Sequence, residues 1–282
     1  MDDQPKPSVT DSRITSTMMP VHLSLNHLLD RAGHLFASNE VISRLPDKSY
    51  VHHTYGDIHR RTRQLAQSLL NLGLRKGERV ATLCWNHHVH LECYFGIPAA
   101  GGVMHTLNLR LSPEELAWIV NDAKDRFLIV DDVLLPLLAE FKHLCHFEKI
   151  IVFPFSTQAY AGPDLNYEAM LADTDISNFD YVKHHEDDAV SMCYTSGTTG
   201  KPKGVVYSHR STLLHTLVGC LGDFWSLRST DVVLPVTPMF HANSWGIPYG
   251  AMMMGSKLVF PGPHLHPDDL LDLMQYAPPT LA

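Results

Sequence analysis

The sequence predicts an α/β fold with mostly parallel sheets flanked by helices. Short apolar runs alternate with helix-like segments over the first 155 residues, which favours parallel strands with helices on both faces. Hydrophobic residues make up 45% of the 282 residues and charged residues 18%, so the chain can bury a sizeable core. We expect a flexible segment over residues 1–23 and one incomplete large domain over 24–282, divided into a first α/β subdomain at 24–155 and a second region at 189–282.

Two helices are predicted before the first buried strand. Ser24 can accept hydrogen bonds from the first free amides of a helix that follows it. Thr54 and Asp57 have the spacing of a capping box, leucines follow at helical intervals, and Gly73 is a natural stop. These signals predict a long second helix that ends just before Gly73.

Strands and helices alternate after this point. Residues 79–84 form a short apolar run typical of a buried strand, and a helix-like stretch over 88–100 ends at a pair of glycines. Ser112, followed by Pro113 and two glutamates, predicts another helix start. The other predicted elements are strands at 127–130, 150–153, 232–234 and 258–260, helices at 133–144, at 243–254 and from Pro267, and a connector over 154–188.

Charge and cysteine usage exclude several classes of protein. The 22 Lys and Arg against 30 Asp and Glu give a net charge of −8, so a nucleic-acid partner is not expected. The five cysteines have no CxxC spacing, and the chain shows no export signal and no apolar run of about 18 residues, so we expect a cytoplasmic protein. The sequence leaves open whether the protein contacts a membrane surface. The 19 histidines lack zinc-like spacing, and no histidine metal site is expected.

The segment 194–204 is a glycine-rich loop between two apolar runs. Its three glycines let the backbone curl, while its hydroxyl groups, backbone amides and two lysines can surround an anion. Thr195 and Pro202 stand where the common P-loop has glycine and a hydroxyl residue. The pattern therefore predicts a phosphate-binding strand, loop and strand, rather than a helix N-terminus.

This loop, continued by residues 205–209, resembles the signature loop of the adenylate-forming acyl-CoA synthetase superfamily. Members activate a carboxylate by its attack on the α-phosphate of ATP, and many then pass the acyl group to the thiol of coenzyme A. The resemblance implies that the loop wraps the β- and γ-phosphates, that the Thr195 hydroxyl helps to hold Mg²⁺, and that Lys203 is a more dependable charge than Lys201. The implied phosphate-binding residues are Thr195, Ser196, Gly197, Thr198, Thr199, Gly200 and Lys203.

A second motif, at 238–246, resembles the substrate-side motif of the same family. The resemblance places His241 near the reacting carboxylate, as the implied catalytic residue. The implied acyl-pocket residues are His241, Asn243, Trp245 and Gly246. The motif is most similar to medium- and long-chain fatty acyl-CoA ligases, which implies a fatty acid, ATP, Mg²⁺ and coenzyme A as partners. Dimers occur among such relatives, and the sequence leaves open whether this protein forms a homodimer.

Three later motifs of the family, for adenine, for ribose and for a C-terminal lysine, have no counterpart in the sequence. We therefore expect the N-terminal portion of a fatty acyl-CoA ligase, truncated before the later sheet and the small C-terminal domain. Alone it should be inactive or nearly so, because the phosphate donors lack their partners. Two alternatives stay open: another carboxylate activator, such as an aryl-CoA ligase or an amino-acid adenylation domain, and a non-catalytic nucleotide-binding fragment.

Overall fold

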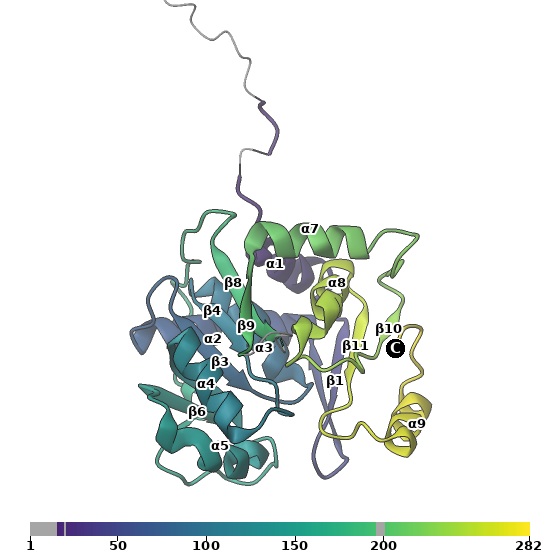
Figure 1. Ribbon diagram of the computed structural model, residues 1–282. Helices are drawn as coiled ribbons and strands as arrows, with labels where there is room; N and C mark the ends of the chain where they lie inside the picture. The colour runs from purple at the N-terminus through teal and green to yellow at the C-terminus, as the bar shows by residue number, and fades with distance from the viewer. Residues whose placement is uncertain (1–15, 20, 196–200) are drawn as a thin grey trace, which may run out of the picture.

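The computed structural model describes residues 16–19, 21–195 and 201–282, whose strands form two sheets (Figure 1). Most of the predicted flexible segment over 1–23 lies outside the described residues. The larger sheet has the strand order β7-β6-β5-β3-β4-β8-β9, and every neighbouring pair is parallel except β8 and β9. Its strands are β3 (Arg79–Leu83), β4 (Val103–Thr106), β5 (Asp125–Asp131), β6 (Lys149–Phe153), β7 (Leu165–Asn166), β8 (Ala189–Thr195) and β9 (Lys203–Ser208). The predicted α/β class is confirmed.

The smaller sheet joins the two ends of the chain. Its order is β10-β11-β1-β2, and β1 pairs in parallel with β11, with Val41 opposite Leu258. Its strands are β1 (Glu40–Arg44), β2 (Tyr50–Thr54), β10 (Val232–Val233) and β11 (Lys257–Phe260). Each of the regions 24–155 and 189–282 contributes strands to both sheets, so the sequence division does not coincide with a division of the sheets.

Helices separate and cover the sheets in layers (Figure 1). One layer of helices lies between the two sheets, and its apolar residues share a core with strands of both sheets. Helices α4 and α5 cover the other face of the larger sheet, and α9 covers the other face of the smaller sheet. The helices are α1 (Leu25–Leu35), α2 (Tyr55–Asn71), α3 (His88–Ala99), α4 (Pro113–Ala123), α5 (Leu135–Phe141), α6 (Tyr167–Ala172), α7 (His209–Gly219), α8 (Ile247–Met254) and α9 (Pro267–Tyr276), with short 3₁₀ turns η1 (Asp132–Leu134), η2 (Lys142–Leu144) and η3 (Ala242–Gly246).

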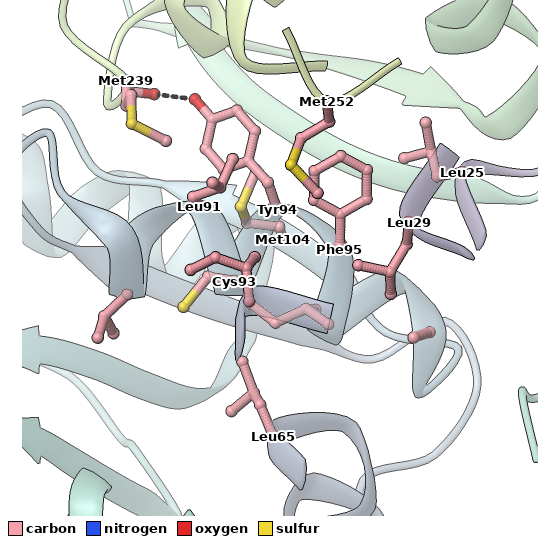
Figure 2. Packing of buried hydrophobic residues seen from close by; sticks show 14 of the residues in the cluster. Leu25, Leu29, Leu65, Leu91, Cys93, Tyr94, Phe95, Met104, Met239 and Met252 are labelled. Atoms are coloured by element: carbon pink, nitrogen blue, oxygen red, sulfur yellow. Dashed lines mark hydrogen bonds between the residues drawn. The ribbon is translucent and has the colours of Figure 1, made fainter. Parts of the chain in front are cut away.

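Helix α3 is the centre of the inner layer. All twelve of its residues are buried, as expected of a helix that neighbours contact on every side. Figure 2 shows Leu29 of α1 and Met252 of α8 near Phe95, whereas Leu65 of α2 lies on another side of the helix, against Gly96. None of the described helices is long and apolar enough to cross a lipid bilayer.

Local helix signals are confirmed where they were predicted. Ser24 caps α1, Thr54 and Asp57 form the capping box of α2, and Gly73 follows the C-cap with φ +86°. Ser112 caps α4 through a capping box with Glu115. The predicted helix at 133–144 is present as η1, α5 and η2 in succession.

Two predicted segments differ from the structure. The connector over 154–188 contains a short strand, β7, and a helix, α6. The predicted helix over 243–254 is wrong in its first turn, because α8 begins only at Ile247. The preceding residues 242–246 have left-handed backbone angles, which no right-handed helix contains.

Candidate functional site

The residues that flank the predicted phosphate loop lie at the carboxyl end of β8 in the larger sheet. Its two flanking residues face each other, since β8 ends at Thr195, β9 begins at Lys203, and the two residues pair across the hairpin. Both are exposed, and residues 196–200 lie outside the described part of the chain. Parallel sheets bind ligands at this edge, because the loops after their strands meet there. The two strands that were predicted on either side of the loop are therefore present.

The two lysines of the loop differ in their surroundings. The ammonium group of Lys201 lies 5.3 Å from the ring centroid of Trp118, a cation–π distance. Lys203 is exposed at the first position of β9, directly across from Thr195. The ranking of Lys203 above Lys201 as the phosphate-binding charge stays a prediction.

Buried side chains hold the segment before His241 in place. Asn86, which follows β3, accepts a hydrogen bond from the Met239 amide at 2.7 Å and donates to the carbonyls of Pro235 and Thr237 at 2.8 and 3.1 Å. Tyr94 of α3 donates to the Met239 carbonyl at 2.6 Å (Figure 2). Both backbone groups of Met239 are thus satisfied by side chains. Sequence analysis missed Asn86, whose only signal is a polar residue between two apolar runs.

A left-handed turn follows His241. Residues 242–245 have φ between 46° and 54°, and Gly246 has φ +80°. For residues other than glycine this conformation costs roughly 1–2 kcal/mol each, so surrounding contacts must hold it. One such contact is the hydrogen bond from the Asn243 amide group to the Ser191 hydroxyl of β8, at 3.0 Å. The turn therefore joins the second motif to the strand that leads into the phosphate loop.

We expect Ala242→Gly to raise the free energy of unfolding by about 1 kcal/mol, because glycine adopts φ 46° without the clash that a Cβ causes. Urea denaturation measures the change. Ala251→Gly is the matched control: in the right-handed helix α8, the same substitution should lower stability by about 1 kcal/mol. A fall in stability for Ala242→Gly would contradict the left-handed turn.

A cavity of about 510 Å³ lies beside this turn. It is framed by β9, α7, the loop after α7, η3 and α8, and contains three of the four predicted acyl-pocket residues. Its lining residues are Tyr207, Ser211, Thr212, His215, Phe224, Trp225, Ala242, Asn243, Trp245, Gly246 and Tyr249. His241, the fourth, is exposed and lies at the start of the turn outside this lining. Trp245 is 62% exposed, so it forms part of the cavity's rim.

The cavity wall is mostly aromatic, but it also includes the polar residues Ser211, Thr212, His215 and Asn243. Aromatic rings dominate the lining, and the described lining residues include no Asp, Glu, Lys or Arg. Burial raises the pKa of Tyr207 to about 12 and raises the pKa of the neighbouring Cys193 thiol, so both stay protonated near neutral pH. Such a wall suits the uncharged part of a small molecule.

One buried cluster has the side chains of a metal site. Ligand atoms of Cys84, His87 and Asp131 lie within 4.8 Å of one another. The Asp131 carboxylate already pairs with His87 Nε2 at 2.9 and 3.0 Å and accepts the Trp85 amide at 2.8 Å. Burial also raises the pKa of Cys84 well above its usual range, which favours the thiol over the thiolate that metals bind. We interpret the cluster as a polar network that joins the loop after β3 to the end of β5.

Comparison with known proteins identifies the family. A family model described as AMP-binding enzyme matches residues 30–282. A long-chain-fatty-acid–CoA ligase of Thermus thermophilus is 45% identical over 262 residues, which are 92% of this chain and 47% of the relative. A 3-methylmercaptopropionyl-CoA ligase of Ruegeria lacuscaerulensis is 40% identical over 94% of this chain and 50% of the relative.

Solved structures agree in fold. An anthranilate CoA ligase in complex with anthranoyl-AMP superposes with a TM-score of 0.81 at 24% identity, over 95% of this chain and 50% of that one. A long-chain-fatty-acid-CoA ligase from Archaeoglobus fulgidus gives 0.80 at 21% identity, over 92% and 51%. At these identities the likeness shows the fold alone.

The chain therefore belongs to the AMP-binding enzyme family. Within that family its relatives are adenylate-forming acyl-CoA ligases, which use ATP and coenzyme A. The chain spans about half the length of the curated relatives that it matches.

Proposed function

We propose that this chain provides the ATP-phosphate site and the acyl pocket of an acyl-CoA ligase that acts on fatty acids. The observation that supports it most is the largely aromatic cavity. Its residues Tyr207 and Asn243 contact Cys193 and Ser191 of β8, within four residues of Thr195. An alkyl chain in the cavity would thus lie beside the strand whose end flanks the phosphate loop.

The proposed chemistry needs a carboxylate, a triphosphate and positive charge at one place. The carboxylate oxygen attacks the α-phosphorus of ATP, and pyrophosphate leaves; the acyl group then passes to the thiol of coenzyme A and AMP is released. Lys203 would attract the phosphates, and loop amides would meet their negative charge. The exposed Thr195 hydroxyl fits a hard oxygen-seeking cation shared with phosphate oxygens. Mg²⁺ bound there would neutralise charge on the leaving pyrophosphate.

The cavity also bears on the alternatives. An amino-acid substrate would call for a carboxylate near its ammonium group, and the described lining residues offer none. Relatives named for other acids, such as a benzoate–CoA ligase of Arabidopsis thaliana at 32% identity, keep an aromatic acid as the second candidate. Binding of octanoate and benzoate, compared by calorimetry, separates the two. Tighter binding of benzoate would favour the aryl-CoA alternative.

We expect Lys203→Ala to weaken Mg·ATP binding by about tenfold or more, because the ammonium group stands beside the proposed phosphate loop. Calorimetry on the full-length protein measures the affinity. Lys149→Ala is the matched control, since Lys149 is also an exposed first residue of a strand, and should leave ATP binding unchanged. Unchanged ATP affinity in Lys203→Ala would contradict the phosphate role, and loss of its thermal unfolding transition would show that the lysine is structural.

A further inference from the structure

Helix α7 carries apolar residues on its outer face as well as on its inner face. The helix contacts α1 and α8 and runs along the outside of the molecule (Figure 1). Leu213 is buried on the inner side. Leu214, Leu217 and Val218 are exposed, and their spacing of three and four residues places them on one face. A surface helix normally turns polar residues outward, so an apolar outer face indicates an interaction surface.

This apolar face continues through the turn after α7 to the rim of the cavity. The Leu221 amide donates to the Val218 carbonyl, and the Phe224 amide donates to the Leu221 carbonyl, both at 3.1 Å. Phe224 and Trp245 are exposed and also line the cavity. We call these residues the α7 patch, and each is between 41% and 66% exposed: Leu214, Leu217, Val218, Leu221, Phe224 and Trp245.

The part of the chain that bears the patch is poor in acidic residues. Residues 189–267 contain five Lys or Arg and two Asp, a net charge of +3. Because the whole chain has a net charge of −8, the other residues together carry −11. Arg210 and Arg228 precede and follow the α7 patch in the sequence and are exposed, although Arg210 also pairs with Glu186. Basic residues beside an exposed apolar face suit a surface of anionic lipids.

The shared rim favours a lipid surface over a protein as the partner. A protein that covered Phe224 and Trp245 would obstruct the rim of the cavity. A lipid surface brings alkyl chains to that rim, so an acid dissolved in the lipid reaches the cavity without exposing its chain to water. Tryptophan also suits the boundary between lipid and water, because its ring is apolar and its N–H is polar.

We propose that the α7 patch docks on a membrane surface that contains anionic lipids, and that the acid substrate enters the cavity from that surface. Leucine, valine and phenylalanine side chains of the patch enter the lipid, while Arg210 and Arg228 lie near the head groups. The entry of the acid rests on the proposed function, since it takes the cavity as the acyl pocket. Docking on the membrane does not depend on it.

Flotation of the full-length protein with vesicles tests the docking. We expect binding to vesicles of phosphatidylcholine and phosphatidylglycerol that weakens as salt is added, and weaker binding to phosphatidylcholine alone. Leu217→Gln/Val218→Gln should bind the mixed vesicles about tenfold less, because amides replace two apolar side chains. The matched control, Leu144→Gln/Leu271→Gln, replaces exposed leucines on η2 and α9 and should bind like the wild type.

Substrate entry is measured separately on the same proteins. Oleate supplied in the mixed vesicles should be converted to oleoyl-CoA several-fold more slowly by Leu217→Gln/Val218→Gln than by the wild type. Octanoate in solution should be converted at equal rates by both, since neither residue lines the cavity. A wild type that converts neither acid would contradict the proposed function, and flotation alone would then decide the docking.

Three results would overturn the docking. The first is a wild type that does not bind the mixed vesicles, and the second is a Leu217→Gln/Val218→Gln variant that binds them like the wild type. The third is a wild-type dimer that does not float with vesicles and that this variant converts to monomers, which would show that a second copy covers the α7 patch. If the rest of the full-length polypeptide covers the patch, the first result comes with a lower thermal unfolding temperature in the variant.

Discussion

Arg61→Ala is expected to lower the free energy of unfolding by about 3–5 kcal/mol, the cost of leaving a buried charge without its partner. Arg61 of α2 pairs with Glu92 of α3, with 2.6 Å between Nε and Oε1, and donates to both Glu168 oxygens at 2.7 and 2.8 Å. The Glu92 side chain is fully buried, and its other oxygen accepts the Tyr167 hydroxyl at 2.6 Å. Urea denaturation measures the loss.

The loss should also depend on pH. Burial raises the pKa of Glu92, and Arg61 opposes that rise, so the pKa in Arg61→Ala should be higher still. An unfolded glutamate loses its proton near pH 4.3. Between that pH and the raised native pKa, the unfolded state binds fewer protons than the native state, so stability falls as pH rises. We expect a smaller deficit at pH 5 than at pH 7.5.

Arg60→Ala is the matched control on the same helix. Arg60 is exposed and contacts Gln64 and Asp57 within α2, so its loss should cost less than about 1 kcal/mol. If Arg60→Ala and Arg61→Ala cost the same, or if the Arg61→Ala deficit does not change with pH, the buried network does not act as described.

Asn86→Ala should cost about 3 kcal/mol and weaken binding of the acid substrate. The substitution removes three hydrogen bonds at once, two to carbonyls and one from the Met239 amide, and their backbone partners lie in the segment before His241. Without them, Met239 keeps only its bond from Tyr94. The left-handed turn would then lose the support that fixes its position beside β8.

Urea denaturation and calorimetry with octanoate check these two effects separately. Asn178→Ala, at an exposed position, should change neither. Full stability and full acid affinity in Asn86→Ala would show that Asn86 does not position the motif. Lower stability with unchanged affinity would limit its role to the fold.

Helix starts were the most predictable feature because their signals are local. Thr54 with Asp57, and Ser112 with Glu115, satisfy each other's backbone within three residues, and no distant contact is needed. Helix α7 also has a capping box, but Ser211 replaces the acid that marks the motif in a sequence. Its exposed residues also include Leu214, Leu217 and Val218, which blur the polar stripe that marks a surface helix, and the helix was not predicted from the sequence.

Features that depend on distant contacts were not predictable. Residues 243–246 lead directly into the apolar segment of α8, and the left-handed turn there depends on contacts such as that of Asn243 with Ser191, which the sequence does not reveal. Strands β1 and β2 were missed, and β1 pairs with a strand near the other end of the chain.

The candidate site was predictable in part. Motif resemblance singled out Thr195 and Lys203, which lie opposite each other across the hairpin, and three residues that line one cavity. It could not find Asn86, because the hydrogen-bond partners of that side chain lie about 150 residues away.

The pairing of β1 with β11 also has a consequence for folding during synthesis, because β1 leaves the ribosome long before its partner strand. Leu258 is synthesised 217 residues after Val41, so at about 5–20 residues per second the edge of β1 waits roughly 10–40 s for its partner. During that interval its backbone groups are open to other nascent chains. A chaperone that covers this edge during synthesis would therefore be expected to raise the yield of native protein.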